Sequence, residues 1–112
     1  MNSRSPVPKD KKLTVVFRVE HGCLGPQGKD HVERFCDYAQ QAFASTWSDF
    51  VDWEIIPRES IAQPEIQYEI NKRRLDRDKA GKYLAMFSET PDALEGYLHD
   101  KAVHLIEEYM AR

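Results

Sequence analysis

The sequence predicts an α+β fold: a two-layer sandwich in which a four-stranded, mostly antiparallel sheet carries two helices on one face. Two patterns lead to this prediction. Apolar and polar residues alternate over residues 66–70 and 83–87, on either side of a charged segment, which is typical of a hairpin with one buried face. A helix start follows directly, because Thr90 is a good N-cap, Pro91 suits the first turn and Asp92 adds a favourable negative charge. The elements are therefore expected in the order β-α-β-β-β-α.

The first third of the chain is predicted to form a strand, a loop and a helix. β-branched and aromatic residues alternate with others over residues 13–20, as in a half-buried strand. Three glycines and a proline make residues 22–28 a loop. Residues 29–44 place apolar side chains at helical spacing along one stripe, which is expected to face the core: Val32, Phe35, Cys36, Ala39, Ala42 and Phe43.

Three further strands are predicted in the middle of the chain. The first covers residues 50–56, with Trp53 directed into the core. The other two are the hairpin strands, at about residues 65–73 and 82–87. Turn-forming residues favour a turn between them, although residues 71–82 are also compatible with a helix.

The last helix is expected to extend to about Met110. Gly96 lies inside it and lowers helix propensity, so we interpret this glycine as a point of close approach to the sheet. The strand-helix-strand unit at the start of the chain predicts that the first two strands are parallel, with the remaining pairs antiparallel.

Composition limits the classes of function. A chain of 112 residues predicts one domain, here residues 13–112, preceded by a mobile polar leader at residues 1–12. The net charge of -3 provides no general attraction to nucleic acid or anionic membranes. No apolar run is long enough for a membrane helix. Two cysteines indicate free thiols rather than a disulfide framework, so we expect a cytoplasmic protein.

A small catalytic corner is one candidate site. His21 and Cys23 flank Gly22 at the end of the first strand, and His31 follows in the first turn of the helix. A cysteine near a helix N-terminus can act as a nucleophile, so these residues are weak catalytic candidates. No spacing typical of a metal site is present, and neither a metal nor a cofactor is expected.

Positive charge is concentrated in the predicted hairpin at residues 72–82, where Arg73, Arg74 and Arg77 are binding candidates. The order α-β-β-β-α resembles that of double-stranded-RNA-binding domains, but only as an analogy of element order. Those domains place basic residues at the start of their last helix, whereas residues 90–95 here are acidic. Nucleic-acid binding is therefore a secondary hypothesis, and an acidic partner or a solvated hairpin tip are alternatives.

The outward face of the sheet is the preferred binding candidate. If the strands lie as predicted, Val16, Ile56, Leu84 and Met86 form a mixed apolar patch on this face, which is typical of a moderate interface. We therefore expect a non-catalytic domain that binds a protein partner or self-associates, through the open sheet face or the basic hairpin. A small enzyme built on the corner at His21, Cys23 and His31 is the alternative.

Overall fold

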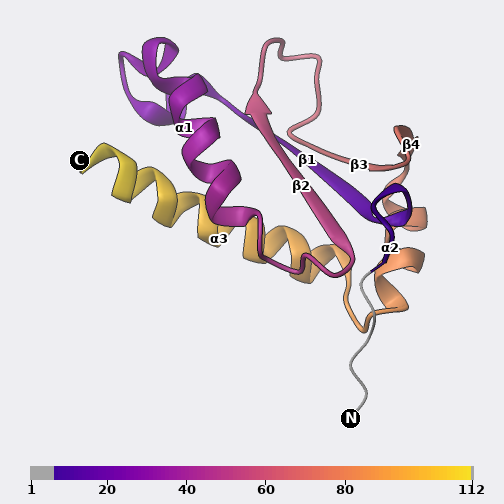
Figure 1. Cartoon of the computed structure of the whole chain (residues 1–112). Coiled ribbons are helices and arrows are strands. Elements are labelled where there is room, and N and C mark those ends of the chain that lie inside the picture. The colour runs from indigo at the N-terminus through magenta and orange to yellow at the C-terminus, as the bar shows by residue number, and fades with distance from the viewer. Residues whose placement is uncertain (1–6, 112) are drawn as a thin grey trace.

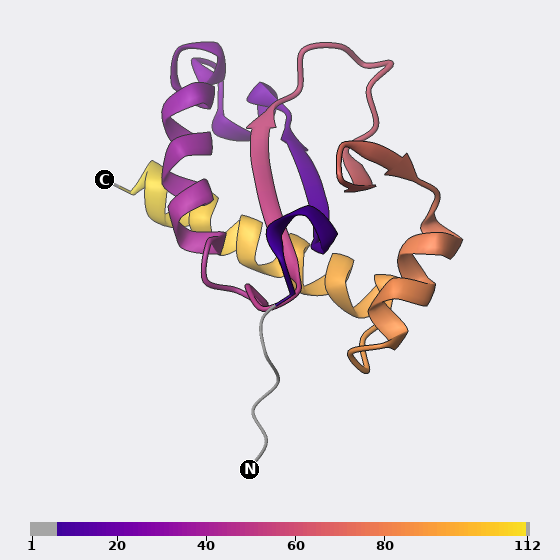
Figure 2. The ribbon, with the colours of Figure 1, turned by 45° about the vertical axis from the view of Figure 1, so that its right-hand side comes forward.

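The computed structural model describes residues 7–111. Four strands form one mixed sheet in the order β2-β1-β3-β4, and two long helices, α1 and α3, pack against one of its faces (Figures 1 and 2). The strands are β1 (Leu13–Val19), β2 (Val51–Pro57), β3 (Ile66–Ile70) and β4 (Arg73–Leu75). The helices are α1 (Gly28–Phe43), α2 (Arg77–Ala85) and α3 (Pro91–Met110), with short 3-10 turns η1 (Lys9–Lys11) and η2 (His21–Leu24). The predicted α+β class and four-stranded sheet are confirmed.

The register of the sheet agrees with the predicted directions. β1 and β2 are parallel, with Val15 opposite Trp53, whereas β1 and β3 are antiparallel, with Val15 opposite Tyr68. These three side chains are buried, because they lie on the sheet face that the helices cover. Trp53 packs its ring against Phe43 of α1, with centroids 4.9 Å apart. The predicted inward orientation of Trp53 is therefore confirmed.

The prediction of a second hairpin strand at residues 82–87 is wrong. Residues 77–85 form helix α2, and the strand that pairs with β3 is the short β4. Asp76 is the N-cap of α2, because its side chain accepts a hydrogen bond of 2.8 Å from the Lys79 amide. Ala80 and Leu84 are fully buried, and their spacing of four residues is that of one helix face. The alternation that suggested a strand here is thus a coincidence within a helical segment.

A two-residue turn joins β3 to β4. Asn71 and Lys72 both have positive φ, at 52° and 67°, which is the conformation that a type I′ turn requires at its two central positions. Asparagine tolerates this region, but lysine at the second position is unusual, since glycine would adopt it without steric cost. Ile70 lies opposite Arg73, so the turn projects directly beyond the sheet.

The last helix begins and ends as predicted. The Thr90 hydroxyl accepts a hydrogen bond of 3.1 Å from the Ala93 amide, and Pro91 is the first helical residue. Gly96 does not approach the sheet, however. It is exposed, and a Cβ added to it would meet no atom within 4 Å. The predicted packing role of this glycine is therefore wrong.

The segment before β1 lies partly in the described region. Residues 1–6 of the predicted leader are outside the described residues. Val7 donates a backbone hydrogen bond of 2.8 Å to Asp49, and Lys9 forms an ion pair of 3.0 Å with Asp52 of β2. Residues 7–12 therefore follow a defined path along the start of the sheet. No helix in the described part of the chain combines the length and apolarity needed to cross a bilayer.

Candidate functional site

The three residues of the predicted catalytic corner lie on two adjoining elements, His21 and Cys23 on η2 and His31 on α1. His21 lines a hollow together with Lys29 and Arg58, whereas the ring of His31 lies against Tyr109 of α3, with centroids 6.2 Å apart. Cys23 is exposed and does not line the hollow that contains His21. Within residues 7–111, no three His, Cys, Asp or Glu side chains are grouped so that they could hold a metal ion. The catalytic role expected of His21, Cys23 and His31 stays a prediction.

The predicted apolar patch on the open sheet face is also not formed. Leu84 is fully buried on α2, and Met86 follows that helix with its side chain 67% exposed, away from any strand. Val16 does lie on the uncovered face, but its side chain is only 2% exposed. Ile56 is half-buried. The expectation that Leu84 and Met86 extend a sheet-face patch is wrong, because the segment that carries them is helical.

The open face is instead polar. Asp52 and Glu69 flank Thr14 in the register, and Glu54 and Gln67 flank Val16 in the same way. A shallow hollow of about 600 Å³ lies over this face, bordered by Lys9 and by Lys72 of the β3–β4 turn as well as by these carboxylates. The floor of the hollow is therefore acidic and its border toward the turn is basic.

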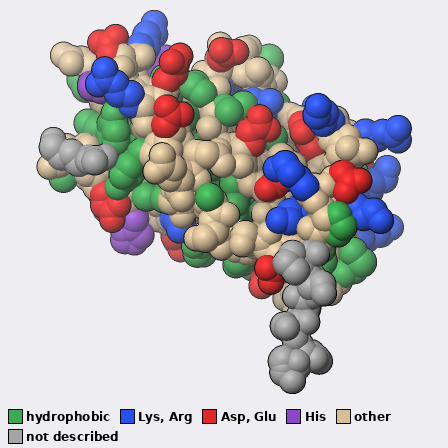
Figure 3. All heavy atoms as spheres, in the orientation of Figure 1, with side chains coloured by type: hydrophobic (Ala, Val, Ile, Leu, Met, Phe, Trp, Pro, Cys, Tyr) green, Lys and Arg blue, Asp and Glu red, His purple; other side chains and the backbone are tan. Residues whose placement is uncertain are grey.

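Basic side chains gather at one end of the sheet, from segments far apart in the sequence. Residues 9–12 and 72–82 contain nine of the 16 Lys and Arg residues of the chain, but only three of its 19 acidic residues. Leu13 pairs with Ile70 in the register, which brings the residues before β1 to the β3–β4 turn. Figure 3 shows Lys and Arg side chains concentrated on the side where Figure 1 places β4 and α2.

Helix α2 is attached to this same end of the sheet. The Tyr83 hydroxyl donates a hydrogen bond of 2.8 Å to the carbonyl of Phe50, directly before β2. Lys79 and Lys82 of α2 are both exposed. We call the resulting surface the basic end and define it by seven exposed or half-exposed residues: Lys11, Lys12, Lys72, Arg73, Arg74, Lys79 and Lys82.

The side chains of the basic end have no ion-pair partner among residues 7–111. Their charges are therefore not held in ion pairs, although the register places Glu69 opposite Arg74. Such a cluster creates a local positive potential that attracts an anionic ligand, even though the net charge of the chain is negative. Sequence reasoning identified the hairpin arginines, but Lys11 and Lys12 were assigned to the leader, because only the strand register shows that they lie beside the turn.

Arg77 differs from its basic neighbours, because its guanidinium is already occupied. Nη2 pairs with Asp92, and Nε lies 3.3 Å from Glu95 Oε2, so this arginine joins α2 to the first turn of α3. Glu95 also accepts a hydrogen bond from the hydroxyl of Tyr68 in β3. Burial, followed by this hydrogen bond, raises the pKa of Tyr68, and the hydrogen bonds to Glu95 and Asp92 raise the pKa of Arg77. These groups connect α2 to α3 and to β3, and the guanidinium of Arg77 is paired with two carboxylates.

No protein-family model, curated protein or solved structure matches the chain.

Proposed function

We propose that this domain is a protein-binding module whose basic end holds an acidic segment of a partner protein. The observation that carries the proposal is a group of seven cationic side chains without ion-pair partners, at residues 11–12, on the β3–β4 hairpin and on α2. The electric field of several like charges increases the rate of encounter with an oppositely charged partner and disfavours partners of the same charge.

The backbone of the β3–β4 turn supports this proposal. Lys72 occupies a positive-φ position, where a residue with a Cβ costs roughly 1–2 kcal/mol relative to glycine. Backbone strain of this kind persists where the surrounding structure enforces it, and it is concentrated at functional sites. A lysine at this position adds a positive charge to the turn, at the hollow that Lys9 and Asp10 of η1 also line. The strain therefore has a functional explanation, because glycine would be more stable but uncharged.

An acidic protein segment fits this surface better than a nucleic acid does. The open sheet face next to the basic end carries Asp52, Glu54 and Glu69, which repel a phosphate backbone that crosses the sheet. The residues that the register places on this face include no aromatic side chain on which a base could stack. An acidic peptide of a few residues can contact the cations without crossing the carboxylates.

Binding of a fluorescein-labelled deca-glutamate peptide, followed by fluorescence anisotropy, tests the proposal. Lys72→Gly is expected to weaken binding by roughly three-fold while it stabilises the fold, and Lys72→Arg is expected to retain the affinity. Lys29→Ala removes an exposed lysine at the other end of the molecule and is the matched control. Affinity should fall as the salt concentration rises.

Two results would overturn the proposal. The first is an equal loss of affinity in Lys72→Gly and Lys29→Ala, which would show that only net charge matters. The second is tighter binding of a 12-nucleotide single strand of DNA than of the peptide at physiological salt, with the same dependence on Lys72. That second result would favour the nucleic-acid alternative.

A further inference from the structure

The connection between β2 and β3 is a tightly braced loop. Arg58 inserts its guanidinium into the loop and donates hydrogen bonds to the carbonyls of Ile61 and Gln63, at 3.0 and 2.8 Å from Nη2. The Gln63 side chain makes further hydrogen bonds within the loop: its Oε1 accepts from the backbone amides of Glu59 and Ser60. Arg58 is itself held by Glu20, at 3.6 Å. The loop therefore has a defined conformation that its own side chains maintain.

The side chain of one isoleucine in this loop is almost fully exposed to solvent. Ile61 is 89% exposed, the largest exposure of any large apolar side chain among the described residues. Single apolar residues on a surface need no special explanation. Ile61 differs because the carbonyl of the same residue is one of the groups that Arg58 fixes, so the side chain is exposed on an ordered backbone. A loop whose backbone is already fixed loses less conformational entropy on binding than a flexible loop does.

A hollow of about 550 Å³ lies directly beside this side chain. Ile61 and Pro57 form one wall, Val32 and Lys29 of α1 form another, and His21 contributes from η2. Three carboxylates line the hollow, those of Glu20, Glu33 and Glu59, against the two cations Lys29 and Arg58; the pairing of Arg58 with Glu20 removes one charge of each sign and leaves an excess of one negative charge. The surface next to the Ile61 side chain is therefore slightly negative.

We propose that Ile61 and the adjacent hollow form a second protein-docking surface, whose partner has an apolar socket bordered by lysine or arginine side chains. Ile61 is the anchor, since burial of its side chain contributes roughly 25 cal/mol for each Å² removed from water. The carboxylates select a basic rim on the partner and disfavour the anionic surface of a membrane. An anchor of one well-placed apolar side chain with a polar surround is the usual arrangement of an interface hot spot.

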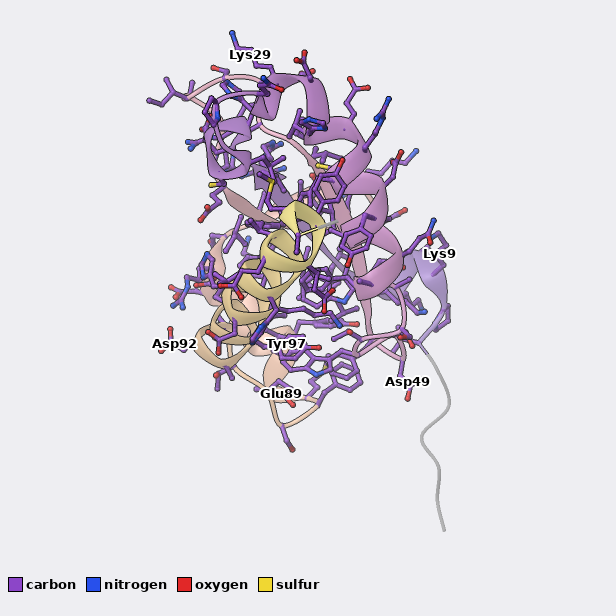
Figure 4. The ribbon with its side chains drawn as sticks, turned by 90° about the vertical axis from the view of Figure 1, so that its left-hand side faces the viewer. Lys9, Lys29, Asp49, Glu89, Asp92 and Tyr97 are labelled. Atoms are coloured by element: carbon purple, nitrogen blue, oxygen red, sulfur yellow. The ribbon has the colours of Figure 1, made fainter. Side chains whose placement is uncertain are left out.

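This surface is distinct from the basic end. Lys29, which lines the hollow, lies at the opposite end of the molecule from Asp49 and Glu89 and well apart from Lys9 (Figure 4). The chemistry of the two surfaces is also opposite, because the basic end selects acidic ligands and the hollow selects basic ones. The two proposals can therefore fail independently.

A phage-displayed library of 12-residue peptides provides the probe. The library is selected on the wild-type protein and depleted on Ile61→Ser, so that the surviving peptides depend on Ile61. We expect these peptides to combine Lys or Arg with aliphatic or aromatic residues. Synthetic versions should bind Ile61→Ser at least ten-fold more weakly than wild type, whereas Val103→Ser, a matched change at a 54% exposed position on α3, should retain the affinity.

A second variant tests the hydrogen bonds that order the loop separately from the Ile61 side chain. Gln63→Ala removes the acceptor of the Glu59 and Ser60 amides but leaves Ile61 in place, and it should weaken the selected peptides by three- to ten-fold. Thermal unfolding of each variant shows whether the fold is retained. The proposal is overturned if no peptide distinguishes wild type from Ile61→Ser, or if the selected peptides are acidic and respond to Lys72→Gly instead.

Discussion

A Cβ built on Gly28 would lie 1.7 Å from the backbone carbonyl oxygen of His21. The first residue of α1 thus packs directly on the backbone of η2, at a distance that only glycine permits. This contact explains why the loop between β1 and α1 carries a glycine at its end. The loop is shaped by close packing of its own backbone, since Gly28 also donates its amide to Gly25 at 3.0 Å.

The contrast between two glycines gives the first prediction. Gly28→Ala must displace η2 or the start of α1, and it should reduce the free energy of unfolding by roughly 2–3 kcal/mol. Gly96→Ala should instead raise it by about 1 kcal/mol, because Gly96 lies in an exposed position inside α3 where alanine is the better helix former. Urea unfolding of both variants measures the two values. Equal effects of the same sign would contradict the packing described for Gly28.

The helical assignment of residues 77–85 gives the second prediction. Leu84 is fully buried on α2, so Leu84→Ala should cost about 2–5 kcal/mol through lost burial and the cavity that remains. Met86 is 67% exposed, and Met86→Ala should change stability by less than about 0.5 kcal/mol. If the two residues lay together on a strand face, as alternation suggested, their costs would be similar. Chemical denaturation followed by tryptophan fluorescence distinguishes the two cases.

The third prediction concerns the edge of the sheet. Gln40 of α1 places its side-chain amide on β2, where Nε2 donates to the Trp53 carbonyl at 2.7 Å and Oε1 accepts from the Ile55 amide at 2.8 Å. These are the hydrogen bonds that one residue of a parallel neighbouring strand would make. Gln40 therefore covers part of an edge that is otherwise open to pairing with another chain.

Gln40→Ala should lower stability by about 1–3 kcal/mol and increase hydrogen exchange at the Ile55 amide, because two partly buried backbone groups lose their partner. Gln40→Glu is the matched control. Its carboxylate can still accept from the Ile55 amide but cannot donate to the Trp53 carbonyl, so exchange at Ile55 should remain slow. Unchanged exchange at Ile55 in Gln40→Ala would show that the side-chain amide of Gln40 does not protect this edge.

The two cysteines give the fourth prediction. Burial, with smaller contributions from Asp37 and Glu33, raises the pKa of the Cys36 thiol to about 12, whereas Cys23 is exposed. In the native protein iodoacetamide should modify Cys23 and leave Cys36 intact, as judged by peptide mass spectrometry. Modification of Cys36 at a comparable rate under native conditions would contradict its burial in α1.

The same shift predicts how stability responds to alkaline pH. Between the ordinary thiol pKa of 9.0 and about 12, the unfolded chain loses the Cys36 proton and the folded chain retains it. The unfolded state therefore binds fewer protons, and stability decreases as the pH rises through this range. Cys36→Ala should make this decrease shallower from pH 9 upward, with Tyr68, whose pKa is also raised, contributing at higher pH. Unfolding midpoints measured in urea from pH 7 to 11 check this.

The sequence by itself determined the local elements whose signals are strong and redundant. Strand β1, helix α1 and the Thr90–Pro91 start of α3 were predictable, because residue preference, periodicity and capping agree in each. The parallel pairing of β1 with β2 was also predictable, since a helix that connects two strands favours it. The hairpin arginines were recognisable as candidates from charge alone.

Tertiary structure decided the rest. Residues 83–87 alternate like a strand, but the Asp76 cap and the burial of Ala80 and Leu84 against the core make the preceding segment a helix. The basic end depends on the register of β1 with β3, which pairs Leu13 with Ile70 and so brings the residues before β1 to the β3–β4 turn. The conformation of the loop between β2 and β3 depends on hydrogen bonds between the side chains of Arg58 and Gln63 and the backbone of that loop. Local propensity acts over a few residues, whereas these surfaces are made by long-range contacts that form only when the whole core is packed.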